Sequence, residues 1–371
     1  MDYIPVNTPL IGDLEKEKLI ECIDTGWISS EGPQVSEFEN NFSKLVNRKY
    51  GIAVSSGTAA LDIAVAALSI GEGDEVILPT FSIISCSAAI VRAGAKPVLV
   101  DSRLDDWNMD VEAIESKINV KTKAIMVVHT YGLPANINPI IELSKKYGVF
   151  IIEDAAEMHG QYYFNQPCGS FGDVSTFSFY PNKHITTGEG GMIVCNKKSI
   201  SDRCKSLRNL CFQKEKRFVH EELGWNYRIT NLQASIGLAQ ISRLESNVRR
   251  KREIGMRYFQ NLKNNKNLLF QMTKTKYSNN IYWVFGMIIK ENFPKDAKDL
   301  MVELNEHNIG TRPFFWPIHL QPVFLKKGWF KGEKYTNSEI MAKKGFYVPS
   351  GLNLTNDQID YVCEKVTKIL G

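Results

Sequence analysis

The chain has 371 residues, of which 43% are hydrophobic and 23% charged, and its 45 Lys and Arg against 41 Asp and Glu give a net charge of +4. This length and composition are typical of a globular protein with two domains, or with one large domain and a smaller one. The positive charge is small and dispersed, so we expect neither a nucleic acid nor a membrane surface as partner.

The N-terminal residues lack the basic head and apolar run of a signal peptide. No stretch stays apolar for the roughly eighteen residues that a membrane span needs. The seven cysteines are odd in number and dispersed, without metal-ligand spacing, which is typical of reduced thiols. We therefore expect a cytoplasmic protein without a bound metal.

Short apolar runs, many of them rich in β-branched residues, recur between stretches long enough for crossover helices. Several are apolar throughout, as strands covered on both faces tend to be. This alternation predicts an α/β fold with a mostly parallel sheet, and such sheets bind ligands beyond the carboxyl ends of their strands. The seven runs span residues 51–56, 74–80, 96–101, 123–129, 149–154, 174–179 and 191–196.

The pattern changes near residue 231, where apolar residues such as Ile241 and Val248 recur at helical spacing with few helix breakers. We expect one long helix that leads out of the main domain. The chain ends in an amphipathic segment for which Thr355 is the expected N-cap. The sequence therefore predicts a large domain over residues 1–245, including an N-terminal arm, and a small α+β domain over residues 246–371.

The first strand run leads into a segment with the composition of a helix start. Ser56, Gly57 and Thr58 fall at this turn, and a helix N-terminus with a glycine and hydroxyl groups offers free N–H groups to an anion. The signal is weak alone, because Ser and Thr cap helices everywhere. A phosphate site becomes the better interpretation only if other strand ends meet it.

Two later strand ends supply the rest of a cofactor site. Asp154 ends the fifth run, and Lys183 follows the sixth run, which carries Ser178. Pyridoxal 5′-phosphate (PLP) needs a lysine for its aldehyde, an acid for its ring nitrogen and donors at a helix start for its phosphate. The combination is far more specific than any of its members, and it predicts a PLP enzyme.

These residues lie in stretches such as "VSSGTAALDIA", "IIEDAAEMHG" and "GSFGDVSTFSFYPNKHITTGEGGMI". Over essentially its whole length the chain resembles the sugar aminotransferases of the DegT/DnrJ/EryC1/StrS group, which have the aspartate aminotransferase fold, fold type I of the PLP enzymes. The resemblance implies that Lys183 is the Schiff-base lysine, Asp154 the partner of the pyridine nitrogen, Phe81 the ring stacked on the cofactor, Glu157 a neighbour of the 3′-oxygen, and Ser56, Gly57, Thr58 and Ser178 the phosphate site.

The resemblance also implies a homodimer with shared active sites. Asn226 would reach the phosphate of a second subunit, and a monomer would be inactive. The family activity is transfer of an amino group from L-glutamate, through the PLP and pyridoxamine phosphate forms, to the keto carbon of a nucleotide-linked sugar.

Three segments resemble most closely the members that aminate C4 of GDP-4-keto-6-deoxymannose. Within and near them, Trp27, Ser29, Arg217, Arg312 and His319 are candidates for contacts to sugar and diphosphate. Pro181 and His184 depart from the usual residues beside the sugar pocket, and we count His184 as a substrate contact. A UDP- or dTDP-linked keto sugar stays open, as does the fate of the amino sugar in the O-antigen of lipopolysaccharide, another glycan or an antibiotic.

Two rival functions are weighed against aminotransfer. Sugar 3-dehydratases of the same group carry a histidine at the Schiff-base position, where this chain has Lys183. A non-catalytic regulator with the same fold would not need Lys183, Asp154 and Ser178 together. His129 is expected to line the pocket or to make a structural hydrogen bond, and Trp283 and Phe315 are expected in the small-domain core or a subunit interface.

Overall fold

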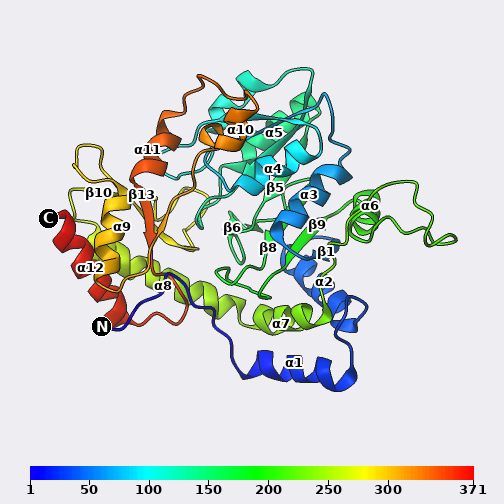
Figure 1. The fold of residues 1–371 in the computed structure, drawn as a ribbon, viewed down its shortest axis with the longest axis horizontal. Coiled ribbons are helices and arrows are strands. Elements are labelled where there is room, and N and C mark those ends of the chain that lie inside the picture. Colours follow the sequence, from blue (N-terminus) through cyan, green and yellow to red (C-terminus); the bar gives the residue numbers. More distant parts are fainter.

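A computed structural model describes all residues, 1–371, and its centre is a seven-stranded sheet (Figure 1). Each of the seven predicted runs forms one of its strands, so the predicted α/β class is confirmed. The strands are β1 (Tyr50–Val54), β2 (Glu75–Pro79), β3 (Lys96–Val100), β4 (Thr122–Val128), β5 (Phe150–Asp154), β8 (Val174–Ser178) and β9 (Gly191–Cys195), in the order β1-β9-β8-β5-β4-β2-β3.

Strand β9 is antiparallel to both of its neighbours, whereas every other pair in this sheet is parallel. Six strands therefore point the same way, and their carboxyl ends meet at one edge. Because side chains alternate along a strand, Ile52 and Val54 face one core and Ala53 faces the other. Helices must cover both faces to bury these runs.

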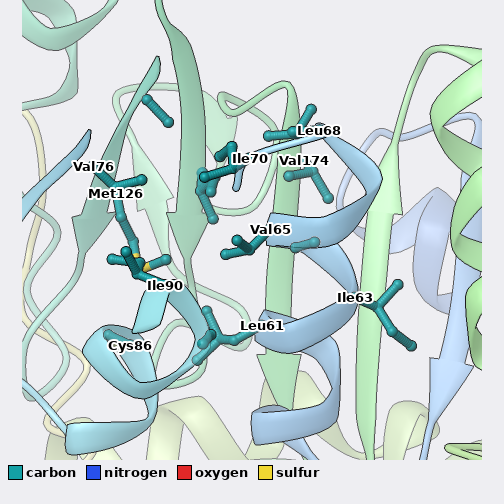
Figure 2. Packing of buried hydrophobic residues seen from close by; sticks show 14 of the residues in the cluster. Leu61, Ile63, Val65, Leu68, Ile70, Val76, Cys86, Ile90, Met126 and Val174 are labelled. Atoms are coloured by element: carbon teal, nitrogen blue, oxygen red, sulfur yellow. The ribbon is translucent and has the colours of Figure 1, made fainter. Parts of the chain in front are cut away.

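One face of the sheet is covered by α3 (Gly57–Ala67), α4 (Ile84–Arg92) and α6 (Lys198–Arg208). Figure 2 shows Leu61 and Val65 of α3 packed beside Ile90 of α4 over the strands. The other face is covered by α2 (Pro33–Leu45), α5 (Ile137–Tyr147) and α7 (Asn231–Ser242).

A second sheet of four antiparallel strands lies in the C-terminal third of the chain. Helices α8 (Leu244–Leu262), α9 (Ala297–Glu306) and α12 (Asn356–Leu370) pack on it. Thr355 caps α12 as predicted, accepting a hydrogen bond from the Gln358 N–H. The strands are β10 (Leu268–Phe270), β11 (Phe285–Ile289), β12 (Arg312–Pro313) and β13 (Gly345–Val348), in the order β10-β11-β13-β12.

The single long helix predicted from residue 231 is two helices, α7 and α8. They separate at Arg243, whose backbone (φ −106°, ψ 3°) leaves the helical region while its guanidinium pairs with buried Glu15 of α1 (Asp13–Thr25). Helix α7 packs against α1 and α2, and α8 packs against α12. The break lets each half follow a different neighbour, which apolar periodicity alone does not reveal.

Two segments cross between the sheets. Near the N-terminus, Ile4 pairs with Ile309 and is buried in the core of the small sheet. In the other direction, Ile318, Phe324 and Phe330 pack into the core of the large sheet. We propose to keep residues 1–245 and 246–371 as the two domains, with these segments exchanged between them.

The remaining short elements connect these layers. No helix is long and apolar enough to cross a lipid bilayer. The short elements are η1 (Val111–Ala113), η2 (Glu115–Lys117), β6 (Tyr162–Tyr163), β7 (Gln166–Pro167), η3 (Ile318–Leu320), α10 (Pro322–Lys326) and α11 (Thr336–Lys344).

Candidate functional site

A cavity of about 380 Å³ opens at the carboxyl ends of the parallel strands. Residues from the ends of β4, β5 and β8 meet there with the start of α3, as expected when parallel strands end at one edge. Seven of the predicted cofactor residues line this cavity: Ser56, Gly57, Thr58, Asp154, Glu157, Ser178 and Lys183.

The start of α3 forms one end of the cavity. Ser56 caps the helix, its Oγ accepting the Ala59 N–H at 3.1 Å, and the first N–H groups of a helix have no acceptor within it. A Cβ on Gly57 would lie 2.8 Å from Cβ of Ser178, so only glycine lets the Ser178 hydroxyl approach the helix start. Helix dipole, free N–H groups and hydroxyls together fit a phosphate.

Asp154 lies at the end of β5, buried inside the cavity. The thiol of Cys86 donates to Oδ2 at 3.2 Å and the Ala156 N–H donates to Oδ1 at 3.0 Å. Burial raises the pKa of Asp154, while these two donors and the charge of Lys183 act against the rise. A buried carboxylate of this kind fits the protonated nitrogen of a pyridine ring.

Lys183 follows β8, and its amine lies between an acid and an aromatic ring. Its Nζ is 3.8 Å from Oε1 of Glu157 and 3.8 Å from the ring centroid of Trp283. Burial lowers the pKa of Lys183, which the charges of Glu157 and Asp154 partly offset. Burial has the opposite effect on the carboxyl group of Glu157 and raises its pKa. Both shifts favour a neutral amine, the form that attacks a carbonyl carbon.

Behind the cavity lies a second buried acid, Glu153, on the opposite side of β5 from Asp154. The Ala135 N–H donates to Nδ1 of His129 at 3.1 Å, so the imidazole proton sits on Nε2, which donates to Glu153 at 3.2 Å. His129 also lines the cavity. The two expectations for His129 are therefore both met.

The structure does not place Phe81 where the resemblance implies. Its ring is fully buried and packs against Tyr131, Phe314 and Phe315 at 5.8 to 6.0 Å between centroids, outside the cavity lining. Two residues later, Ile83 lines the cavity with 42% of its surface exposed. The stacking role of Phe81 therefore stays a prediction.

Two predicted substrate contacts, His184 and His319, do not line the cavity. The ring of His184 is fully buried and absent from the cavity lining. His319 is equally buried, with Nδ1 bonded to the Thr80 hydroxyl at 2.8 Å and Nε2 to Glu339 at 3.1 Å. Both ring nitrogens of His319 are occupied by the protein, which argues against a role in binding sugar.

The other predicted contacts are exposed or peripheral. Trp27 and Ser29 lie on the loop after α1, and Arg217 stacks on Phe212. Asn226 is exposed and accepts a hydrogen bond from Arg228. None of these lines the cavity, so their roles remain predictions.

Arg312 is paired in the small sheet with a residue that lines the cavity. That residue is Tyr347, which lines the cavity together with Trp283 and Phe315. Sequence reasoning missed these three aromatic residues as site residues. No local pattern distinguishes them from core, because the fold of the small domain alone brings them to Lys183.

The fold and the cavity together define a PLP enzyme of the aspartate aminotransferase type, with a lysine, a buried acid and a phosphate cradle at one sheet edge. The chain belongs to the DegT/DnrJ/EryC1/StrS aminotransferase family, which it matches over residues 9–367. It is accordingly a PLP-dependent sugar aminotransferase that takes a nucleotide sugar and an amino donor.

Two relatives match along nearly their full length. A GDP-perosamine synthase of Escherichia coli O157:H7 is 42% identical, with 99% of each chain covered. One of Vibrio cholerae is 38% identical, with 97% of each covered. The structure of E. coli GDP-4-keto-6-deoxy-D-mannose-3-dehydratase with bound hydrated PLP is 26% identical and gives a TM-score of 0.90, covering 98% of this chain and 99% of that one.

Proposed function

We propose that the protein moves the amino group of L-glutamate to C4 of GDP-4-keto-6-deoxymannose and so makes GDP-perosamine. The observation that carries this proposal is the 42% identity, over 369 residues, to a GDP-perosamine synthase. The cavity supports it, because Lys183 stands where the related dehydratases are expected to have histidine.

We propose the following roles for the chain's own residues. When bound, PLP supplies an aldehyde that condenses with amines and a ring that accepts the electrons left when a carbon loses its proton. Asp154 would hold the proton on the ring nitrogen. Gly57, Ser178 and the start of α3 would bind the phosphate. Lys183 Nζ would bond the aldehyde and then move the proton at the reacting carbon, with Glu157 beside it.

Mass spectrometry of products from a panel of keto sugars tests the substrate. With glutamate as donor, GDP-4-keto-6-deoxymannose is expected to gain an amino group at least about tenfold faster than UDP- or dTDP-linked 4-keto-6-deoxy sugars, an estimate based on the loss of a few polar contacts to the base. Faster amination of a UDP- or dTDP-linked sugar would contradict the GDP assignment. Loss of the 3-hydroxyl without amination would identify a dehydratase.

We further propose that two chains share each active site. The loop before Asn226 projects from the body of the molecule beyond α6 (Figure 1). Three apolar side chains on it are largely exposed: Phe218 (80%), Val219 (55%) and Leu223 (88%). Apolar surface of this kind on a projecting loop favours a partner, and an isologous dimer would bury it.

Mixing two inactive variants tests this arrangement. Lys183→Ala and Asn226→Ala subunits, mixed after dissociation, should recover about one quarter of wild-type activity. Half of the random dimers are mixed, and each mixed dimer contains one intact site. No recovery, although sedimentation shows mixed dimers, would place Lys183 and Asn226 in the same chain's site.

A further inference from the structure

The amine of Lys183 rests against the face of Trp283, a residue of the small domain. The indole is 4% exposed and its centroid is 3.8 Å from Lys183 Nζ. Its Nε1–H donates to the backbone oxygen of Asn182 at 2.8 Å. The ring is therefore tied to the residue directly before the lysine that it covers.

A second lysine holds Trp283 from behind. Lys251 of α8 is 2% exposed, and its Nζ donates to the backbone oxygens of Trp283 and Ser350, each at 2.6 Å. Tyr282, directly before Trp283, has a left-handed backbone (φ 50°), which a residue with a side chain adopts only where its surroundings impose it. The position of Trp283 is thus fixed by the hydrogen bond of its ring, by the hydrogen bond to its backbone oxygen and by the conformation of Tyr282.

We propose that Trp283 is a positioning residue for Lys183, and that its indole face is the resting place of the free amine between the two half-reactions. The inference rests on the proposed role of Lys183 as the residue that bonds the cofactor. Lys251 serves as the anchor that keeps this resting place aligned with α8.

The ring acts on the charge of the amine as well as on its position. An aromatic face stabilises an ammonium group, most strongly when the pair is shielded from water. The titratable groups facing Lys183 are Glu157 and Asp154, which favour the charged form, and Lys251, which disfavours it. Burial lowers the pKa of the nearby imidazoles His159 and His184, so both are neutral in the pH range of the test. Removing the indole leaves these groups in place, so the Lys183 pKa should fall.

The test follows PLP uptake by the cofactor-free protein against pH, read from the absorbance of the lysine-bound cofactor. Only the neutral amine attacks the aldehyde, so the uptake rate rises with pH through the Lys183 pKa. For Trp283→Leu we expect a midpoint about one pH unit lower, from the usual size of a shielded cation–π contact. We also expect a lower plateau rate and a kcat reduced about tenfold at little changed KM, the scale expected when a reacting group is slightly misplaced.

Trp107→Leu is the matched control, because Trp107 is a buried indole of the same aromatic cluster that does not line the cavity. Its midpoint should equal that of wild type. Trp283→Phe keeps an aromatic face, so its pH midpoint should lie between those of wild type and Trp283→Leu. This variant also provides the test if Trp283→Leu does not fold. A wild-type midpoint in the Trp283 variants would overturn the inference.

Lys183→Ala separates failure of this inference from failure of the proposed function. With the lysine gone, the absorbance of lysine-bound cofactor should not develop at any pH. If it does develop, the role of Lys183 itself is wrong, whatever the Trp283 variants show.

Discussion

Lys183→Ala is expected to reduce turnover by about a thousandfold or more, the scale of a lost general base that is also the covalent attachment point. The variant removes the only amine beside Glu157 in the cavity, so neither bonding of the aldehyde nor proton movement at the reacting carbon has a substitute. Steady-state rates with glutamate and the GDP-linked keto sugar, at equal PLP content, provide the measurement.

Lys198→Ala is the matched control for that experiment, because Lys198 is exposed on α6, where it pairs with Asp202. It should turn over at the wild-type rate. If Lys183→Ala kept more than about a tenth of wild-type turnover, a contribution too small for a covalent catalyst, the assignment would have to move to another amine.

Glu153→Gln is expected to destabilise the protein by about 3 kcal/mol, the scale of removing one partner from a buried charged network. The carboxylate is fully buried and accepts hydrogen bonds from the Ser175 hydroxyl, His129 and three backbone N–H groups of residues 169–172. A glutamine offers one oxygen to these donors and points its own N–H group at the rest. Chemical or thermal unfolding, compared with wild type, measures the loss.

The same substitution should change the pH dependence of stability. Burial alone would raise the pKa of Glu153, but the bond to His129, the Gly169 N–H and the charge of Arg48 outweigh it and hold the pKa at about 2. A lowered pKa stabilises the fold above the ordinary value of 4.5, and this contribution is lost as the pH falls toward 2. The gap between wild type and Glu153→Gln should therefore narrow from about pH 5 downward.

Glu142→Gln serves as the control, since Glu142 is exposed on α5. Its unfolding should match that of wild type at every pH. An equal loss of stability in both variants would mean that the Glu153 network contributes no more than a surface carboxylate.

The cofactor end of the site could be predicted because sheet topology makes it local to strand ends. Asp154 and Ser178 end adjacent parallel strands, and the turn at Gly57 follows β1 in the same sheet. Residues at these strand ends are therefore expected to lie near one another. The cap at Thr355 was predictable for a similar reason, since its partner Gln358 lies within the same helical turn.

The part of the cavity that the small domain lines was not predictable in this way. Trp283 and Tyr347 reach the cavity only through the packing of the small sheet, about a hundred residues or more beyond Lys183 in the chain. Resemblance assigned Phe81 and His319 to the site by motif. In this chain the Phe81 ring lies in an aromatic cluster, and the His319 ring is bonded to Thr80 and Glu339. The local sequence does not determine the direction of a side chain or its hydrogen bonds to distant segments.

Residues 318–335 return to the large sheet, so the C-terminal part of the chain cannot be exchanged with that of a relative as an independent unit. Ile318, Phe324 and Phe330 complete a core whose other members, apart from Tyr335, come from residues 52–211. Exchanging everything after residue 245 with a relative would thus replace part of the large domain's interior together with the aromatic residues Trp283, Phe315 and Tyr347 of the cavity. Burying a cluster of this size contributes several kcal/mol, so an active chimera would have to keep these three residues of the core. It would also have to keep Trp283 beside Lys183. The lining of the cavity and the stability of the cofactor domain are therefore coupled in one stretch of chain.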